Sequence, residues 1–313
     1  MSGIACVGIL VADVIVKPVA HLPERGKLSY TDSIGLFPGG NAMTAALNLA
    51  KQGVKVSLTG MVGQDHFGDF LLRTAREGGV CTRGVKQTER AQTSSSVLMI
   101  GEDGERSYFH CVGANGIFSV RDIDRSVIQE ASTVFVTGSF LMDTFDGAET
   151  AEFLKECKEE HRRTALDVCW DGKGRWGRVL NEVLPYVDVF LPSLDEAQAL
   201  TGKETPEGMA EVLFARGVGS VVIKLGAEGC YLQERREQPG RRIPALRGIS
   251  CVDATGAGDS FCSGFLAALE HGMNFQQAAE YANAAGGLSV TCRGASTAIQ
   301  SYEQVLQFME EHK

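Results

Sequence analysis

The seven residues from Asp253 to Asp259 form the densest group in this chain of residue types that could do chemistry. Gly256-Ala257-Gly258 stands directly before residues 260–269, where apolar side chains repeat at helical spacing. Small residues at a helix N-terminus let successive backbone N–H groups point into one concavity, and the helix dipole adds partial positive charge. The pattern predicts a site for a phosphate or for a developing phosphoryl charge.

Asp259 lies on the first turn of this predicted helix, beside the anion site. A carboxylate held there can accept the proton of an attacking hydroxyl while the amides hold the phosphoryl group. A helix-capping acid beside an ordinary glycine turn would give the same short pattern. The motif by itself leaves both interpretations open.

A second group of candidate residues lies nearer the N-terminus. The segment Gly39-Gly40-Asn41 opens a predicted helix. Its two adjacent glycines permit close approach of a ligand to the backbone. The Asn41 side chain offers a hydroxyl group both a hydrogen-bond donor and an acceptor. Asp13 interrupts an apolar strand, and a carboxylate can bind a sugar diol by accepting two hydrogen bonds. A structural role for Asp13 remains an alternative. Asp65, within the glycine-spaced run 60–68, is a predicted N-cap.

The elements that must position these residues alternate between strand and helix along the chain. Strands are predicted at 4–9 together with 14–16, then at 54–59, 133–137, 164–168, 187–191 and 220–224, and helices at 41–52, 67–77, 148–161, 194–201 and 205–215. Such alternation predicts an α/β fold with a mainly parallel sheet flanked by helices on both faces.

Two segments break this rhythm. Residues 27–37 and 93–111 have strand and turn character without a following crossover helix, and 102–105 carry a hairpin signal. We expect one domain over residues 1–313, with a small projecting β lid at about 14–38 and 93–112. The lid could cover a binding cleft or be an edge extension without a function of its own.

Composition excludes several classes of protein. The formal net charge is -9, which gives no general attraction to nucleic acid or to an anionic membrane. No stretch approaches the length of a membrane span. The nine cysteines are scattered without Cys-x-x-Cys spacing, and the six histidines show no ligand spacing. We therefore predict a reducing, cytoplasmic location and no disulfide framework or His/Cys metal site.

The sequence resembles the ribokinase-like carbohydrate kinases, a family that includes the minor-type phosphofructokinases and adenosine kinase. The resemblance covers nearly the whole chain, and the Asp253–Asp259 motif is its most specific part. In chain order the matching segments are 7–13, 38–41, 60–68, 104–106, 113–115, 224–229 and 253–259. Their occurrence together makes coincidence a poor explanation.

The resemblance implies a role for each matching residue. Asp259 would be the catalytic base, and Gly256, Ala257 and Gly258 would supply the anion hole. It also implies ATP with Mg²⁺, a monovalent cation such as K⁺ in many members, and a lid that often forms a dimer contact. The remaining implied site residues are Asp13, Gly39, Gly40 and Asn41 for the sugar; Lys224, Gly226, Gly229 and Asn283 for the nucleotide; and Asp253 and Thr255, with segment 293–296, for the monovalent cation.

Two positions depart from the family pattern. Ser193 stands where an Asn-x-x-Glu motif usually has Asn, although Glu196, which helps to organise Mg²⁺ through water, is retained. Thr44 stands where many sugar kinases have Asn, which affects the identity of the substrate more than the reaction. Neither change removes the base or the anion hole.

The leading hypothesis is an ATP-dependent kinase acting on a primary hydroxyl of a monosaccharide or sugar acid. A nucleoside kinase is the alternative, and it would need an aromatic slot for which Phe109, Phe118 and Phe140 are the candidates. A non-catalytic sugar or nucleotide sensor would have lost the base or the anion hole. A dinucleotide-dependent dehydrogenase is excluded because no Gly-x-Gly-x-x-Gly follows the first strand. Arg106 is a candidate for binding a phosphorylated substrate.

Overall fold

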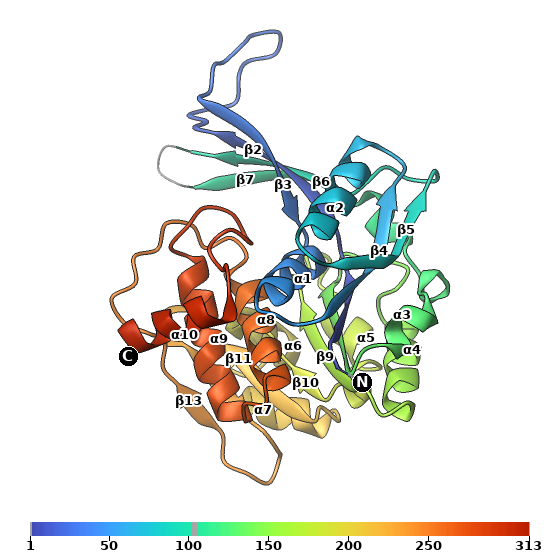
Figure 1. Ribbon diagram of the computed structural model, residues 1–313, viewed down its shortest axis with the longest axis vertical. Coiled ribbons are helices and arrows are strands. Elements are labelled where there is room, and N and C mark those ends of the chain that lie inside the picture. Colours follow the sequence, from blue (N-terminus) through green and yellow to red (C-terminus); the bar gives the residue numbers. More distant parts are fainter. Residues whose placement is uncertain (1, 102–104, 313) are drawn as a thin grey trace.

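The computed structural model describes residues 2–101 and 105–312. Within these residues a nine-stranded sheet crosses the molecule in the order β13-β12-β11-β10-β9-β8-β1-β4-β5 (Figure 1). Strands β11 to β5 in this order are parallel, and β12 and β13 are antiparallel at one edge. The strands are β1 (Ile4–Gly8), β4 (Val56–Gly63), β5 (Cys81–Thr88), β8 (Thr133–Ser139), β9 (Arg163–Val168), β10 (Val189–Phe190), β11 (Ser220–Lys224), β12 (Cys230–Gln233) and β13 (Arg241–Ile243).

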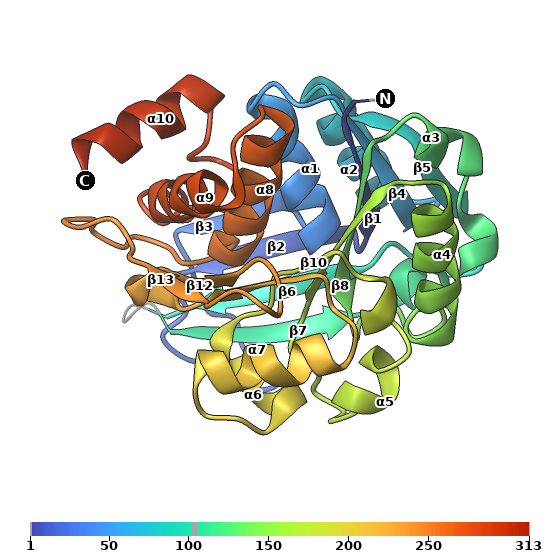
Figure 2. The ribbon, with the colours of Figure 1, turned by 90° about the horizontal axis from the view of Figure 1, so that it is seen from below.

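Helices cover both faces of this sheet, which confirms the predicted α/β architecture (Figure 2). One layer contains α1 (Asn41–Lys51), α2 (His66–Glu77), α8 (Ala257–Glu270), α9 (Phe275–Ser289) and α10 (Tyr302–Glu311). The other contains α3 (Arg125–Gln129), α4 (Ala148–Glu159), α5 (Trp176–Leu180), α6 (Leu194–Thr201) and α7 (Pro206–Ala215). Short 3₁₀ turns lie at Gly113–Ile117, Val120–Asp122, Leu184–Tyr186 and Gly226–Glu228.

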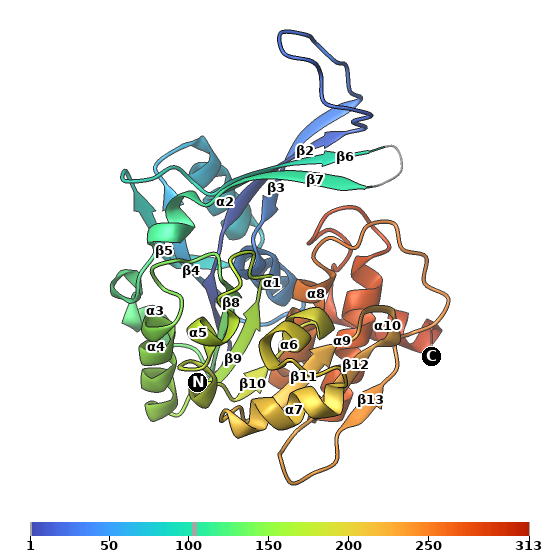
Figure 3. The same ribbon diagram turned by 180° about the vertical axis from the view of Figure 1, so that it is seen from behind.

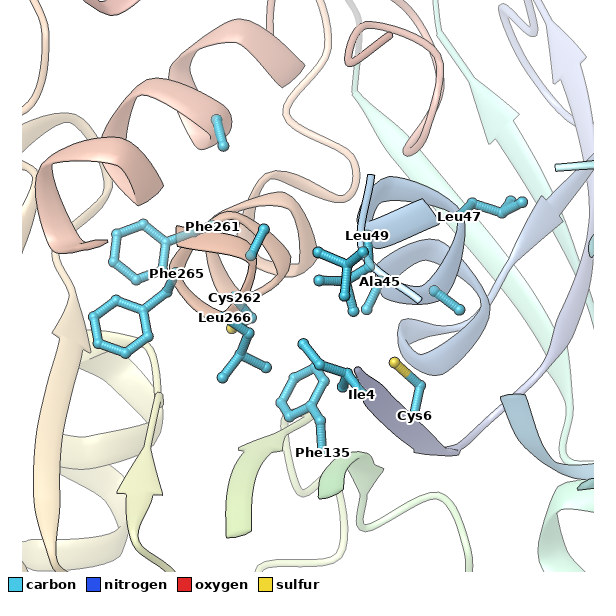
Figure 4. Packing of buried hydrophobic residues seen from close by; sticks show 14 of the residues in the cluster. Ile4, Cys6, Ala45, Leu47, Leu49, Phe135, Phe261, Cys262, Phe265 and Leu266 are labelled. Atoms are coloured by element: carbon cyan, nitrogen blue, oxygen red, sulfur yellow. The ribbon is translucent and has the colours of Figure 1, made fainter. Parts of the chain in front are cut away.

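The central strand β1 shows how the sequence makes this sandwich. All five of its residues are buried, because alternate side chains enter the two opposite layers of the core. Ile4 and Cys6 pack toward α1 and α8, as Figure 4 shows, whereas Ala5 and Val7 pack in the other layer. Helix α8 therefore packs on the sheet through this layer of the core, and this packing fixes the position of its N-terminus relative to the strands.

A second sheet projects from this body (Figures 1 and 3). Among the described residues it has four strands in the order β3-β2-β6-β7, formed by β2 (Val11–Lys17), β3 (Ser33–Gly39), β6 (Ser95–Ile100) and β7 (Arg106–Cys111). Both segments that broke the strand–helix rhythm contribute to it. The hairpin signal at 102–105 falls mostly on residues 102–104, which lie outside the described residues, but β6 and β7 are antiparallel neighbours.

Some predicted elements were wrong in extent or membership. Residues 14–16 fall both in a predicted continuation of the first strand and in the predicted lid segment 14–38. They do not continue the first strand; they belong to β2 in the second sheet and are only partly buried. Three β-branched residues fit either sheet equally well, so their pattern does not identify the partner strands. Of residues 27–37, only 33 onward form a strand, and the predicted strand 187–191 contracts to the two residues of β10. In the described part of the chain, no helix is long and apolar enough to cross a membrane.

Candidate active site

The functional residues collect where the parallel strands end. From β1 the chain continues outward to β4 and β5, whereas β8 to β13 extend in the opposite direction, so the strand order reverses between β1 and β8. Ligands of open α/β sheets bind outside the carboxyl ends of strands at such a point. Asp167 near the end of β9, Ser193 just after β10 and Lys224 at the end of β11 all lie at this edge.

Helix α8 begins as the glycines predict. Gly256 is its N-cap with φ 74°, and a Cβ atom on this residue would lie 2.5 Å from the Cβ of Ala295. Only glycine meets both conditions, the left-handed backbone and the close neighbour. The first helical hydrogen bond runs from the N–H of Ser260 to the carbonyl of Gly256. The amides of Gly258 and Asp259 therefore belong to the first turn, where no earlier carbonyl of the helix can accept from them.

Asp259 is held between helix α1 and this first turn. The Nδ2 of Asn41 donates a hydrogen bond to the Oδ1 of Asp259 over 2.7 Å. Burial raises the pKa of Asp259 to about 7, with a further contribution from the neighbouring Asp167 carboxylate, while Lys224 and the Asn41 bond act in the opposite direction. A carboxyl group with a pKa near neutrality is well matched to accept a proton at physiological pH.

Lys224 is the positive charge of the site. Its Nζ lies 2.7 Å from Oδ1 of Asp167, and the two side chains are only 13% and 2% exposed. Burial lowers the pKa of Lys224, but Asp167 and Glu196 outweigh this effect and leave the pKa well above its ordinary value, so the ammonium stays charged. A Cβ on Gly258 would lie 3.5 Å from the same Nζ, which puts this charge beside the start of α8.

Asp13 and the paired glycines meet at the junction of the two sheets. A Cβ on Gly39 would lie 1.9 Å from Oδ2 of Asp13, so glycine at this position makes room for the carboxylate. Gly40 has φ 87° and lies against the backbone of Ile9 and Val11. Burial raises the pKa of Asp13 to about 6, and a hydrogen bond with Ser96 partly opposes the rise. Asp13 and Asp259 thus flank the segment Gly39–Asn41 from opposite ends.

Ser193 and Glu196 form the capping box of α6. The backbone N–H of Ser193 donates to Oε2 of Glu196 over 2.7 Å, and the N–H of Glu196 donates to Oγ of Ser193 over 3.3 Å. Burial raises the pKa of Glu196, while Lys224 opposes the rise. Across the described residues, no three His, Cys, Asp or Glu side chains are grouped to hold a metal ion. The single carboxylate of Glu196 with the neighbouring Ser193 hydroxyl fits Mg²⁺, which is usually held by one or two carboxylates, waters and substrate phosphates.

Asp253 and Thr255, the predicted monovalent-cation residues, lie together just before the helix. The N–H and the hydroxyl of Thr255 both donate to Oδ1 of Asp253, and the N–H of Gly294 donates to Oδ2. Arg106 of β7 lies 3.3 Å from the same carboxylate and also donates to the Thr255 hydroxyl. The second sheet is therefore in direct contact with the loop that leads to the start of α8. The monovalent cation itself stays a prediction.

All four predicted nucleotide residues line one cavity of about 360 Å³ beside the start of α8. Gly229 is essential to its shape, because it has φ 97° and its Cβ would lie 2.1 Å from the carbonyl oxygen of Ile243. Asn283 donates from Nδ2 to the carbonyls of Ile243 and Pro244, which fixes the same wall. The rest of the lining is mostly apolar and includes Leu246, Ile249 and Val290. A flat aromatic base suits such a wall.

A second cavity of about 510 Å³ lies between the second sheet and the loops at 252–253 and 293–294. Ile15, Lys17 and Phe37 line it from the sheet. Residues 13, 15 and 17 alternate along β2, so this is the face of the sheet that also bears Asp13. The loop between the two cavities contributes Asp253 to this one and Cys251 and Ala254 to the other.

Sequence reasoning missed three residues of this site. Asp167 is the second-last residue of the predicted strand 164–168, and a carboxylate near the carboxyl end of such a strand was a usable signal. Cys169 donates from Sγ to Oδ1 of Asn41 over 3.2 Å, but its residue type suggested only a small hydrophobe. Ser96 reaches Asp13 from a neighbouring strand, a contact that depends on strand register.

The Asp259 carboxylate on the first turn of α8, the glycines at the start of that helix and a separate cavity of about 360 Å³ are the features expected of a phosphotransferase of the sugar-kinase class. Residues 1–301 match the model of the pfkB family of carbohydrate kinases, and the chain belongs to that family. The predicted fold, enzyme class and family resemblance are thereby confirmed.

The relatives carry several different sugar-kinase names. The 2-dehydro-3-deoxygluconokinase of Bacillus subtilis is 25% identical over 305 residues, covering 93% of this chain and 92% of the relative. An ATP-dependent ribose-1-phosphate kinase of Halopiger xanaduensis is 29% identical, covering 94% and 93%. The structure of Arabidopsis thaliana ribokinase with ribose and ATP matches with a TM-score of 0.85, 24% identity and 99% coverage of both chains. A putative ribokinase II of E. coli with ATP and Mg²⁺ matches with a TM-score of 0.86, 22% identity and complete coverage.

The buried pair Lys224–Asp167 should dominate the local stability of the site. Asp167→Asn would leave a buried ammonium without its main partner, and we expect a loss of about 3 kcal/mol in the free energy of unfolding. Lys224→Met should cost as much, and the double variant should lose less than the sum. Urea denaturation measures all three.

The exposed pair Lys155–Glu159 is the control, because its side chains are 57% and 66% exposed. Glu159→Gln should change the free energy of unfolding by less than about 1 kcal/mol. Equal urea midpoints for Asp167→Asn and Glu159→Gln would contradict the stabilising role of the buried pair.

Proposed function

We propose that this protein transfers the γ-phosphoryl group of ATP to a hydroxyl group, in the first instance a primary one, of a monosaccharide or sugar acid. The observation that carries the proposal is the placement of the Asp259 carboxylate on the first turn of α8, between Asn41 and the charged Lys224. In that arrangement a proton acceptor and an anion site lie side by side, as transfer to a hydroxyl requires.

In the proposed reaction Asp259 accepts the proton of the attacking hydroxyl as the bond to phosphorus forms. The first-turn amides of α8 and the helix dipole stabilise the negative charge on the transferring group. Lys224 adds a fixed positive charge beside Gly258, held there by Asp167. Most of the rate enhancement then arises from positioning and electrostatics, because phosphoryl transfer needs little covalent chemistry from the protein.

The nucleotide is assigned to the 360 Å³ cavity lined by Lys224, Gly226, Gly229 and Asn283. Bound Mg²⁺ would neutralise phosphate charge, and Glu196, with Ser193, would hold its waters. The capping box orients the Glu196 carboxylate for this task. ATP and Mg²⁺ are bound in a related solved structure, which supports the same pair of ligands here.

The sugar is assigned to the space between Asp13 and Asp259, with Gly39, Gly40 and Asn41 along one side. The second sheet would then act as the lid, because the face that bears Asp13 also lines the 510 Å³ cavity. Closing such a lid excludes water and limits wasteful hydrolysis of ATP. Thr44 is buried one turn after Gly40 and takes the position that many sugar kinases fill with Asn.

The positions of the aromatic residues and of Asp259 do not favour the two alternative functions, a nucleoside kinase and a non-catalytic sensor. A nucleoside kinase needs an aromatic slot, but Phe118 packs on Phe145 in the core, Phe140 packs on Trp176, and Phe109 lies 61% exposed on the lid. A non-catalytic sensor would lack the base or the anion hole, and both Asp259 and the glycines of the loop are retained. The scattered free cysteines support our prediction of a cytoplasmic location.

Replacing Asp259 tests the reaction directly. A coupled assay of ADP release, with Mg-ATP and a panel of monosaccharides, sugar acids, sugar phosphates and nucleosides, identifies the substrate of the unaltered protein. With that substrate, Asp259→Asn should lower kcat by about 10² to 10⁴ because the proton acceptor is lost. Sugar binding, measured by calorimetry, should be largely kept. Near-normal turnover of the variant would refute the assignment of the base, and nucleosides as the preferred substrates would refute the sugar.

The value of kcat/KM should depend on pH through the carboxyl group of Asp259. Asp259 must be ionised to accept a proton, and its pKa is raised to about 7, so kcat/KM should rise with pH and level off above neutrality. At pH 6 about one carboxyl in ten would be ionised, which implies a rate about tenfold below the plateau. Initial rates at subsaturating sugar measure this profile. A rate that stays constant between about pH 6 and pH 8 would contradict it.

We also propose that a second copy of the chain covers the outer face of the lid. This face carries Leu36, Val14, Val97 and Phe109 in one row across all four strands, with Ile34 beside them. Ile34 is 69% exposed and Phe109 61% exposed, an unusual concentration of apolar surface for a monomer. An apolar row that crosses all four strands suits packing of one sheet on another.

Charged residues on this outer face should separate the copies. Ile34→Glu and Phe109→Glu each place a charge in the apolar row, so we expect a dimer in sedimentation velocity for the unaltered protein and a monomer for the variants. Arg236→Glu, on the exposed loop after β12, is the control and should leave the mass unchanged. A monomeric unaltered protein would refute the proposed interface.

A further inference from the structure

Three elements meet through one side-chain amide beside Asp259. Cys169, directly after β9, donates from Sγ to Oδ1 of Asn41 over 3.2 Å. Asn41, the first residue of α1, donates in turn from Nδ2 to Oδ1 of Asp259 over 2.7 Å. We propose that Cys169 is a positioning residue for the transfer reaction, because its thiol fixes the Asn41 amide in the orientation that presents Nδ2 to Asp259. This inference rests on the role of Asp259 in the proposed function.

The need for such a device follows from the shape of the amide. The oxygen and the NH₂ group of Asn are almost equal in size, and the amide rotates freely about its last side-chain bond. With the amide reversed, its oxygen would face the carboxylate of Asp259 and its NH₂ would face sulfur, which is a weak acceptor. A donor at the position of Cys169 favours one orientation over the other.

The surroundings of Cys169 keep it a donor. Burial raises the pKa of its thiol well above the ordinary value, and the carboxylates of Asp167, Asp259 and Glu196 raise it further, while Lys224 opposes them. Asp167 lies in β9, which ends directly before Cys169. The other three groups come from α8, α6 and β11 in turn. A thiolate, which would accept a hydrogen bond and favour the reversed amide, is therefore suppressed.

The consequence lies in the orientation of the base. With Oδ1 of Asp259 engaged by Asn41, the second carboxylate oxygen is the one that meets the hydroxyl proton. Loss of the thiol removes one of the two hydrogen bonds that orient the Asn41 amide and leaves the base in place, so turnover falls modestly while binding of ATP is kept. A hydrogen bond of ordinary net strength corresponds to a change in kcat of about three- to tenfold.

A double-mutant cycle tests this coupling, with kcat and KM measured on the sugar that the ADP-release panel identifies. Cys169→Ala should lower kcat about three- to tenfold with KM for ATP unchanged. Cys169→Ser should recover most of the rate, because the hydroxyl is again a donor. In an Asn41→Ala background, Cys169→Ala should have no further effect. Cys157→Ala is the matched control; Cys157 is a buried cysteine of α4, so its loss should lower the Tm and leave kcat unchanged.

The possible results distinguish the positioning role of Cys169 from the proposed kinase function. Additive effects of Asn41→Ala and Cys169→Ala, or a Cys169→Ser variant as slow as Cys169→Ala, would overturn the positioning role. Absence of kinase activity in the unaltered protein would refute the proposed function instead. A readout that needs no activity is the infrared S–H band of Cys169, isolated by subtracting the Cys169→Ala spectrum. It should move to higher frequency in Asn41→Ala as the bond is lost, and an unchanged band would also overturn the inference.

Discussion

The buried ion pair between Lys224 and Asp167 is the interaction on which this site depends. Asp167, Glu196 and Asp259 approach one another where the strands end, and carboxylates so close together would repel in a poorly solvated place. The ammonium of Lys224 offsets this charge from within the sheet, two strands away from Asp167. Because the pair is buried and in close contact, it also holds a positive charge next to the first turn of α8.

Close backbone packing is the second constraint, and glycine satisfies it at three critical positions. Gly39 makes room for the Asp13 carboxylate, Gly256 lets the chain turn into α8 against Ala295, and Gly229 shapes the wall of the cavity proposed for the nucleotide. A side chain at any of these positions would bring its Cβ to within 2.5 Å of a neighbouring atom, which would have to move by about an ångström. In phosphoryl transfer a displacement of that size removes much of the benefit of positioning. In the proposed reaction these glycines therefore provide close packing rather than flexibility.

The two faces of the second sheet have different chemistry because side chains alternate along each strand. The inner face carries Asp13 and its partner Ser96, and it contacts the anion-hole loop through Arg106. The outer face carries the apolar row around Ile34 and Phe109. A shift of one residue in register would exchange these faces, so pairing within the sheet sets both the contents of the cleft and the nature of the outer surface.

The sequence by itself determined the α/β class and the start of α8, and it made Asp259 and its glycines the candidate site, because helix periodicity and small residues act over a few neighbouring positions. It also indicated that two segments leave the core, but it placed residues 14–16 both with the first strand and in the lid, and only the structure shows that they belong to β2 of the second sheet. Only the tertiary structure decided that Asn41 touches Asp259, that Asp167 pairs with Lys224, and that Cys169 completes the network. These contacts join residues 218, 57 and 128 positions apart, and they arise from strand order and register, which no local pattern encodes.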